Sequence, residues 1–330
     1  MIAAIDVGSG YVKAISSGSK EGPVSFPSHV GVVGANTLNQ YGMEDMPVIE
    51  YSGRTWATGA DAGRVIPDHK QSNTLDFSWS GSEGWMVLLI RALANMGIMS
   101  GSHRVVVGVP QRVYADKRSE IIEKLTGRHL AVVDDQRFDV NILPGSPMVM
   151  PQAAASLYRL VEQNPALFGN MVGSVDVGTY TTGFAVMEGA NVIPYMSGGV
   201  EIGVSDVAKV LGRLIHDAYG THPTSVALMR AVNDKQMFLN NEMTDLTKMV
   251  SDAADEVVGP LVSELHSMWD KHAASMVIAI VGGGSHLFEK AIRRAFKYAD
   301  APPADKGRFY PVMGKYGALK TQVVSEQGGA

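Results

Sequence analysis

The sequence has no cysteine among its 330 residues. Disulfide bonds, thiolate metal sites and cysteine nucleophiles are therefore excluded. Its nine histidines are scattered without the spacing of zinc ligands, so we expect no zinc site. No apolar run is long enough to cross a bilayer and no basic amphipathic helix opens the chain, so we expect no membrane partner. The opening residues MIAAIDVGSG lack the basic leader of a signal peptide. Together these absences favour a cytoplasmic protein.

The chain also has little excess of charge of either sign. The formal net charge is only -5, so there is no general basic field and we expect no direct binding to nucleic acid. Hydrophobic residues make up 45% of the chain and charged residues 18%, which is typical of a folded protein rather than a disordered one. A chain of 330 residues is long enough for two ordinary domains.

One pattern occurs twice: an apolar strand, the tripeptide Asp-Val-Gly, a turn and a second strand. The first copy begins with the strand 2–5, which ends at Asp6, and the second copy has its aspartate at Asp176. The two aspartates are separated by about half of the chain. We therefore predict an internal duplication of one α/β unit.

The first turn, DVGSG, has the residues of a phosphate cradle. Gly8 and Gly10 let backbone N–H groups approach a phosphate closely, and Ser9 adds a hydroxyl donor. Asp6 at the strand end can hold Mg²⁺, directly or through water, and Lys13 on the next strand can reach a phosphate oxygen. Taken alone, this turn is also compatible with an ordinary hairpin.

The second turn offers the same chemistry. Asp176 is a second strand-end carboxylate for Mg²⁺, Gly178 makes the turn, and Thr179 and Thr181 carry hydroxyl donors. Two hairpins from two halves of one chain can close on a single phosphate group. This repetition favours nucleotide binding over two unrelated hairpins.

A third glycine turn lies between a buried strand and a helix. Gly282, Gly283, Gly284 and Ser285 expose backbone to a flat ligand at a helix N-terminus, where negative charge is favoured. Phe288 follows at a spacing that could place its ring against an adenine. The alternative for Phe288 is a core position on an amphipathic helix.

Gln152 stands at the start of a predicted helix, after Pro151. A neutral amide there could orient a water molecule toward a γ-phosphate, or it could be a helix residue without catalytic duty. Periodicity and breakers predict further elements along the chain. The strands are 11–16, 24–27, 105–110 and 276–284, and the helices are 82–96, 116–126, 204–217, 251–271 with a break at 259–260, and one from 312 or 313 onward.

These residues resemble the actin family, and more closely its bacterial plasmid-segregation branch of ParM-like (StbA) proteins. The motifs similar to the wider family are DVGSGYVK at 6–13, FPSHVG at 26–31, QAAASLY at 152–158, VDVGTYTTGF at 175–184, IVGGGSHLF at 280–288 and GKYGALK at 314–320. The segments similar to the ParM-like branch are WATGADA at 56–62, VVVGVPQRVYADKRSEI at 105–121 and SGGVEIGVSDVAKVL at 197–211.

The resemblance implies the actin-like ATPase fold, with two duplicated α/β domains whose central mixed sheets flank an interdomain nucleotide cleft. Domain I would comprise 1–151 and 312–330, with a small insertion at 31–76, and domain II would comprise 152–311. ATP, or GTP in its place, would bind with Mg²⁺ held through water by Asp6 and Asp176.

The function implied by the resemblance is a polymerising ATPase. Gln152, Asp6 and Asp176 would be its catalytic residues, and hydrolysis would loosen an interdomain closure. Its partners would be further copies of itself in a head-to-tail filament and a DNA-binding adaptor on a plasmid centromere.

Two other functions stay open. One is a small-molecule kinase of the sugar or acetate type in the same superfamily, although such an enzyme needs a general base in the cleft and Gln152 is not one. The other is an actin-like cytoskeletal scaffold unrelated to plasmids. The ribose-binding acid is also undecided, and the candidates are Glu201, Asp234 and Asp255.

Overall fold

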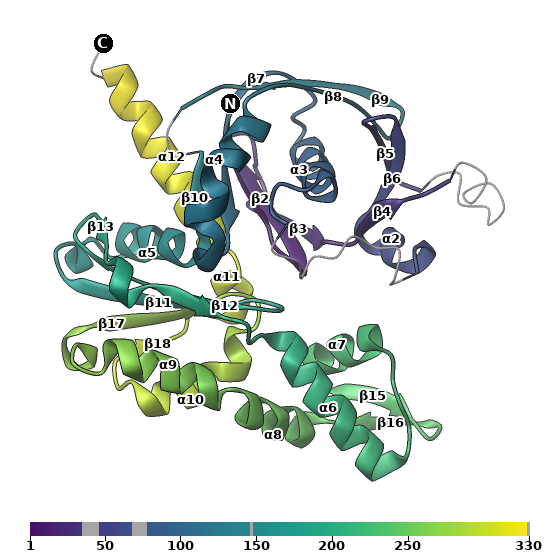
Figure 1. The fold of residues 1–330 in the computed structure, drawn as a ribbon, viewed down its shortest axis with the longest axis vertical. Coiled ribbons are helices and arrows are strands. Elements are labelled where there is room, and N and C mark those ends of the chain that lie inside the picture. Colours follow the sequence, from purple (N-terminus) through teal and green to yellow (C-terminus); the bar gives the residue numbers. More distant parts are fainter. Residues whose placement is uncertain (35–45, 68–77, 146–147, 329–330) are drawn as a thin grey trace. The chain divides into compact units, whose positions relative to one another are not determined.

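Two units carry the repeated strand–turn–strand pattern in the computed structural model, which is shown in Figure 1. Unit 1 comprises Met1–Glu162 and Pro311–Ala330, and unit 2 comprises Gln163–Tyr310. The structure describes residues 1–34, 46–67, 78–145 and 148–328.

The central strands of unit 1 form a mixed sheet. Its order is β3 (Val24–Pro27), β2 (Tyr11–Ser16), β1 (Ile2–Val7), β7 (Ser100–Val109) and β10 (Val149–Pro151). The hairpin pairing β1–β2 is antiparallel, whereas β7 runs parallel to β1 and β10 parallel to β7. Parallel neighbours need long crossovers, which explains why so much chain separates these strands in sequence.

The first residues of β7 pair with β9 on the edge opposite β1, so the sheet continues into a second group of strands. Their order is β9 (Gln136–Ile142), β8 (Gly127–Val133), β5 (Val48–Tyr51), β6 (Arg54–Thr58) and β4 (Val30–Val32). The predicted insertion at 31–76 contributes β4, β5 and β6 to this group, and its segments 35–45 and 68–77 lie outside the described residues. The strands β8 and β9 were not predicted from the sequence.

The helix α3 (Glu83–Asn95) lies inside the curve of the unit 1 sheet (Figure 1). Ser82 caps it by accepting a hydrogen bond from the Trp85 backbone N–H, and every residue from Gly84 to Leu93 is buried. The predicted helix at 82–96 is therefore confirmed. The other α-helices among the described residues of unit 1 are α2 (Gly59–Val65), α4 (Tyr114–Leu125), α5 (Gln152–Gln163) and α12 (Tyr310–Gly328).

The sheet of unit 2 repeats the pattern of unit 1. The hairpin β11 (Met171–Val177) and β12 (Thr182–Glu188) is antiparallel, and β17 (Val277–Val281) runs parallel to β11. The short strand β18 (Ala299–Asp300) is parallel to β17, and β13 (Asn191–Val192) and β14 (Gly198–Val200) are antiparallel to β12. Each unit therefore contains an antiparallel strand, the hairpin and two successive parallel strands in the same order. The predicted duplication of an α/β unit is confirmed.

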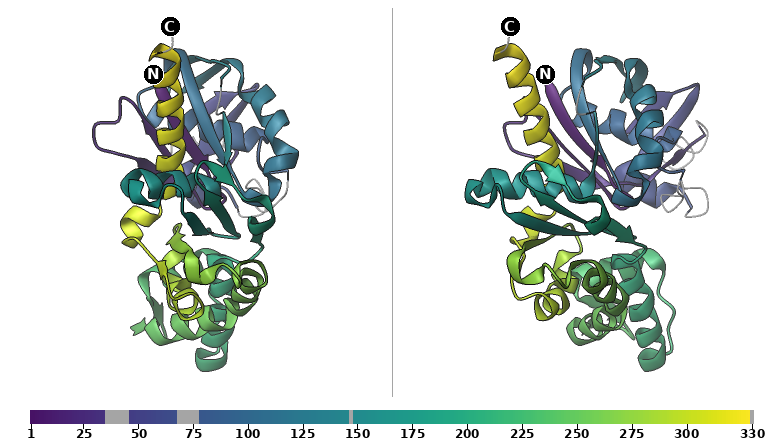
Figure 2. Two further views of the ribbon diagram at one scale, coloured as in Figure 1. Left: turned by 90° about the vertical axis from the view of Figure 1, so that its left-hand side faces the viewer. Right: turned by 60° about the vertical axis from the view of Figure 1, so that its left-hand side comes forward.

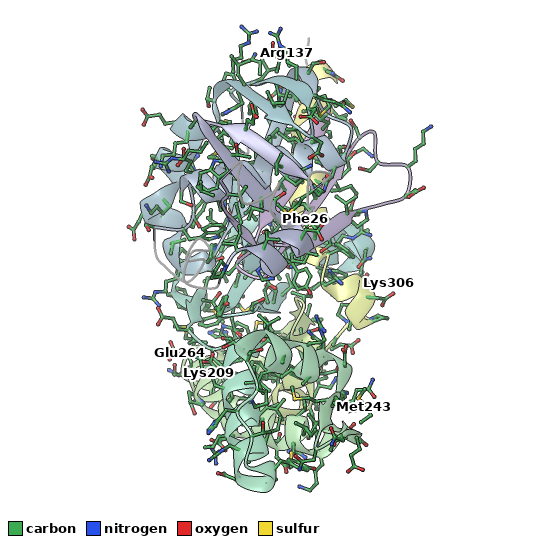
Figure 3. The ribbon with its side chains drawn as sticks, turned by 90° about the vertical axis from the view of Figure 1, so that its right-hand side faces the viewer. Phe26, Arg137, Lys209, Met243, Glu264 and Lys306 are labelled. Carbon is green, nitrogen blue, oxygen red and sulfur yellow. The ribbon has the colours of Figure 1, made fainter. Side chains whose placement is uncertain are left out.

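Helices enclose the core of unit 2. They are α6 (Val204–Tyr219), α7 (Ser225–Asp234), α8 (Thr247–Val257), α9 (Gly259–Trp269), α10 (Ser285–Ala295) and the short α11 (Ala304–Gly307). The break predicted at 259–260 separates α8 from α9, because Pro260 suits only the first turn of a helix. The hairpin β15 (Gln236–Leu239) and β16 (Glu242–Asp245), like α7, was not predicted; Met243, labelled in Figure 3, is exposed on it.

The first predicted domain boundary, between 151 and 152, falls before α5, whereas the compact units divide after Glu162. The reason is that α5 packs on α12. A Cβ atom at Gly314 would lie only 1.8 Å from the Ala155 carbonyl oxygen, so the backbones of the two helices touch. Both views in Figure 2 show α12, in yellow, beside the strands of unit 1. Within the described residues, no helix is both long and apolar enough to span a membrane.

Candidate functional site

The first predicted phosphate turn is a tight turn closed by Gly8. Its N–H donates to the Tyr11 carbonyl oxygen at 3.2 Å, and a Cβ atom at Gly8 would come within 2.9 Å of that oxygen. Ser28, which follows strand β3, holds the turn in place. Its hydroxyl donates to the Gly8 carbonyl at 2.6 Å and its N–H to the Gly10 carbonyl at 3.0 Å. The FPSHVG segment thus has a physical role, which is to hold the DVGSG turn in place.

The second turn has the same geometry. The Gly178 N–H donates to the Thr181 carbonyl at 2.9 Å, and a Cβ atom there would lie 2.8 Å from the same oxygen. This turn is held by the start of α6, since the Val204 and Ser205 N–H groups donate to the carbonyls of Gly178 and Thr179. Two turns with one hydrogen-bond pattern, each after a strand-end aspartate, are what the sequence repetition predicted.

Asp6 is the centre of a polar cluster in unit 1, which we call the Asp6 cluster: Asp6, Lys13, Gln152 and Lys315. The Gln152 Nε2 donates to Oδ1 of Asp6 at 2.8 Å, and the Lys315 Nζ donates to the same oxygen at 3.0 Å. The Lys13 Nζ lies 3.9 Å from Oδ2, as expected from the β1–β2 register that pairs Asp6 with Lys13. Asp6 and Lys315 are both buried.

The electrostatics of the cluster favour an ionised Asp6. Burial alone would raise the pKa of its carboxyl group, but the charges of Lys315 and then Lys13, with the hydrogen bonds from Gln152 and Lys315, outweigh it. The pKa therefore lies below its ordinary value, and Asp6 is a carboxylate at neutral pH. With two lysines and one carboxylate, the cluster has a positive balance and favours a phosphate anion nearby.

The ionised carboxylate also orients Gln152. A carboxylate only accepts hydrogen bonds, so the amide nitrogen of Gln152 must face Asp6. The amide carbonyl oxygen Oε1 is then turned away from Oδ1 and can accept a hydrogen bond from a water molecule. This is the orientation that a water-positioning glutamine requires.

In unit 2, the third glycine turn lies against the second hairpin. Gly282 has a φ of 93°, and a Cβ atom there would come within 2.4 Å of both the Asp176 Oδ1 and the Val177 carbonyl oxygen. The Gly284 N–H donates to the same carbonyl at 3.0 Å. The structure therefore brings Asp176, Gly178 and the Gly282–Ser285 turn together within one unit.

Phe288 is the exception among the predicted residues of unit 2. Its side chain is fully buried in the unit 2 core, next to the start of α10. The prediction of an adenine contact is wrong for this structure, and the core position on an amphipathic helix is correct. Because α10 begins at Ser285, Phe288 falls on its apolar face.

The three candidate ribose acids lie on different elements. Glu201 lies two residues before Gly203, where an added Cβ atom would be 2.5 Å from the Thr179 carbonyl oxygen. It therefore belongs to the segment that packs on the second turn. Asp234 ends α7, and Asp255 is exposed on α8. Of the three, Glu201 is nearest in sequence to the residues that hold this turn.

We expect Gly282→Ala to destabilise unit 2 by about 2 kcal/mol, because the alanine backbone would have to adopt a positive φ and its methyl group would displace Asp176. Chemical denaturation of the nucleotide-free protein measures this change. The matched control is Gly283→Ala, since a Cβ atom at Gly283 would meet no atom within 4 Å. Equal stability of the two variants would contradict the assigned backbone geometry.

The residues present fit Mg²⁺ that is bound through water and phosphate rather than by a protein cage. In the described part of the chain, no group of three or more His, Cys, Asp or Glu residues could hold a metal ion. Oδ1 of Asp6 already accepts two hydrogen bonds, and only Oδ2 is left for a water ligand. A magnesium ion that keeps most of its waters is compatible with this arrangement.

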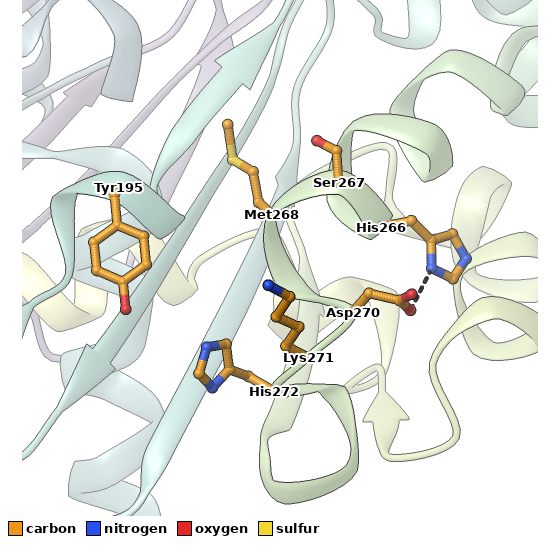
Figure 4. Close-up of a pocket in the computed structure, with 7 residues that line it drawn as sticks. All are labelled: Tyr195, His266, Ser267, Met268, Asp270, Lys271 and His272. Carbon is orange, nitrogen blue, oxygen red and sulfur yellow. Dashed lines mark hydrogen bonds and ion pairs between the residues drawn. The ribbon is translucent and has the colours of Figure 1, made fainter.

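A separate pocket on unit 2 has different chemistry. Figure 4 shows that it lies between Tyr195 and the end of α9, and its lining is Tyr195, His266, Ser267, Met268, Asp270, Lys271 and His272. His266 Nδ1 is 3.1 Å from the Asp270 Oδ1. This pocket contains none of the residues predicted for the nucleotide, so we do not assign it to that site.

Sequence reasoning missed three residues of the candidate site. Lys315 stood in the recognised segment GKYGALK, but a lysine on a helix normally indicates a solvated face, and only its burial reveals its role. Gly108 was part of a predicted strand, and its function is to leave room for Lys315 and Asp6. Ser28 was included in FPSHVG without a stated role.

The repeated sheet and the two glycine turns define the class of this protein: it has the actin-like fold, with two α/β domains. The comparisons with known proteins agree. A family model described as actin-like proteins N-terminal domain matches residues 4–154, and a model described as archaeal actin homologue MreB-like, C-terminal, matches residues 174–294. The chain belongs to the actin-like proteins.

Solved structures share this fold over nearly the whole chain. An archaeal actin homolog, Ta0583, is 16% identical with a TM-score of 0.83, covering 97% of this chain and 99% of its own. The same homolog in complex with ADP has a TM-score of 0.80. A ParM from a 15-stranded Clostridium botulinum filament is 19% identical with a TM-score of 0.76, covering 96% and 99%. No curated protein matches the sequence.

Proposed function

We propose that this chain is an actin-like ATPase that polymerises head to tail and segregates plasmid DNA through a DNA-binding adaptor protein. The observation that carries the enzymatic part is the Asp6 cluster, in which Gln152 donates its amide nitrogen to Asp6 and turns its carbonyl oxygen outward. The cytoplasmic location stays a prediction from the sequence.

In this proposal, one nucleotide contacts both hairpins. The N–H groups and hydroxyls of the two turns bind the phosphates, and Lys13 and Lys315 balance their charge. Mg²⁺, held through water by Asp6 and Asp176, would supply electrostatic stabilisation of the charge that develops on the transferred phosphoryl group. Gln152 holds the attacking water through Oε1, and Asp6 keeps Gln152 in that orientation.

Assembly and plasmid segregation rest on the relatives. The Clostridium botulinum ParM is described as a filament, another similar structure is an Alp12 filament, and the archaeal homolog binds ADP. A head-to-tail contact that does not close into a ring produces an open helical polymer. Loss of the γ-phosphate contacts after hydrolysis would then weaken the polymer, as in other nucleotide switches.

Electron microscopy and sedimentation of the purified protein test this function. We expect filaments and pelleted protein with Mg-ATP, and neither with nucleotide omitted; parallel samples with Mg-GTP establish the nucleotide preference. Protein that stays unassembled across a wide concentration range with every nucleotide would contradict polymerisation. Phosphoryl transfer from ATP to a sugar or to acetate would instead favour the kinase.

We expect Gln152→Ala to retain nucleotide binding while the rate of ATP hydrolysis falls about 100-fold, because the attacking water loses its acceptor. Release of inorganic phosphate measures the rate, and a fluorescent ATP analogue measures binding. Gln322→Ala is the matched control, since Gln322 lies on α12 with an exposed hydrogen bond to Glu326. Wild-type turnover in Gln152→Ala would remove Gln152 from the mechanism.

A further inference from the structure

Both segments of chain that connect the two units carry a side chain that donates a hydrogen bond to the same oxygen atom, Oδ1 of Asp6. The chain leaves unit 1 along α5, whose first residue is Gln152, and returns to it along α12, which carries Lys315. The Gln152 Nε2 and the Lys315 Nζ lie 2.8 Å and 3.0 Å from Oδ1 of Asp6. Gln152 and Lys315, which are 146 and 309 positions away from Asp6 in the chain, therefore meet at the end of strand β1.

The surrounding backbone leaves room for this junction. A Cβ atom at Gly108 on β7 would lie 2.2 Å from the Lys315 Nζ and 2.4 Å from the Asp6 Oδ1, so any larger residue would displace the pair. Gly314, the residue before Lys315, lets α12 touch the backbone of α5. Two glycines on two elements therefore determine where the ammonium group of Lys315 sits.

Stability alone does not account for this lysine. Lys315 has no exposed surface, and taking an ammonium group and a carboxylate out of water costs several kcal/mol per ion. Apolar residues of similar volume commonly stabilise a protein as well as such a buried pair does. A buried ion pair at the end of a strand that carries a candidate nucleotide site therefore points to a role in that site.

We propose that Lys315 is a positioning residue for ATP hydrolysis, which holds Asp6 so that Gln152 presents its carbonyl oxygen to the attacking water. This inference rests on the proposed function. Lys315 occupies one acceptor direction of Oδ1, and Gln152 occupies another, so the carboxylate cannot rotate without losing both bonds. The position of α12 thereby controls the orientation of a residue at the start of α5.

A first experiment observes Gln152 without any nucleotide. The side-chain amide of Gln152 is assigned in ¹⁵N spectra of the full chain as the resonance pair that is absent from Gln152→Ala. We expect Lys315→Met to shift this pair and to speed its hydrogen exchange. Lys320→Met, which removes an exposed lysine from the same helix, leaves the pair in place. An unmoved Gln152 amide in Lys315→Met overturns the proposal, whether or not the protein hydrolyses ATP.

A second experiment is a kinetic cycle. A misplaced water acceptor is expected to lower kcat by about ten-fold or more in Lys315→Met, with a smaller change in KM. If Lys315 acts through Gln152, the double variant Lys315→Met/Gln152→Ala is no slower than Gln152→Ala alone. Rate losses that multiply in the double variant overturn the assignment, because Lys315 would then act independently of Gln152.

Gly108→Ala keeps the test decisive if Lys315→Met does not fold. Its added methyl group displaces the flexible ends of Lys315 and Asp6 while every charge is retained. We expect the same shift of the Gln152 amide and the same loss of kcat. A wild-type amide position and a wild-type kcat in a folded Gly108→Ala protein contradict the positioning role.

Discussion

Gly314→Ala is expected to destabilise unit 1 by about 3 kcal/mol, the largest effect that we expect from a single methyl group in this protein. The added Cβ atom would lie 1.8 Å from the Ala155 carbonyl oxygen and 2.7 Å from its carbonyl carbon. Neither is the end of a flexible side chain, so the helices α5 and α12 would have to move apart. Chemical denaturation measures the loss.

The matched control for this prediction is Gly317→Ala, three residues further along α12. The atoms nearest to a Cβ atom there are those of the Glu162 carboxylate, at 3.6 Å, which is an ordinary contact. Since alanine has the higher helix propensity by about 1 kcal/mol, this variant should be as stable as the wild type or slightly more stable. Equal losses in both variants would mean that α12 does not pack on α5 as described.

Asp6→Asn is expected to cost about 3–5 kcal/mol of stability, because it removes the carboxylate charge that pairs with the buried ammonium group of Lys315. The double variant Asp6→Asn/Lys315→Met removes both charges of the buried pair and should recover most of that loss. A double-mutant cycle in urea measures both changes. A double variant no more stable than Asp6→Asn would show that the two groups are not coupled.

Asp139→Asn is the control for Asp6→Asn, because Asp139 is a carboxylate of the same unit that pairs with exposed arginines. Asp139 pairs with Arg128 and Arg137, and the hydrogen bonds from Arg128 lower its pKa to about 2. Because both arginines are exposed, water screens the pairs and we expect little change in stability. The contrast between the two aspartates isolates the effect of burying Lys315.

Much of the fold could be predicted because the signals are local. The strand and helix periods at β1, β11, α3 and α6 lie within short windows, and the two Asp-Val-Gly turns are tetrapeptides closed by their own backbones. The elements that were missed carry weaker local signals. The strand β8 alternates imperfectly, and the hairpin β15–β16 has only four residues in each strand. The strand β9 is the exception, since Phe138, Val140 and Ile142 alternate regularly with polar residues.

Only those parts of the candidate site whose residue types indicate their chemistry could be predicted from the sequence. Glycine turns and strand-end carboxylates identified Asp6, Asp176 and the Gly282–Ser285 turn. Phe288 was ambiguous, because an aromatic residue on the first turn of a helix is equally suited to a ligand and to a core. Its neighbours in three dimensions resolved this question.

The sequence by itself therefore determined that this chain is a duplicated α/β protein of the actin type with two Asp-Val-Gly turns, since these features depend on neighbouring residues. Only the tertiary structure decided what surrounds Asp6. Lys315 is 309 residues away in the chain, and Gln152 is 146 residues away. No periodicity or spacing connects such positions, because their meeting depends on how α5 and α12 pack against one another and on the space beside Gly108. Lys315, to which the sequence analysis assigned no role, is for that reason a buried partner of the candidate catalytic centre.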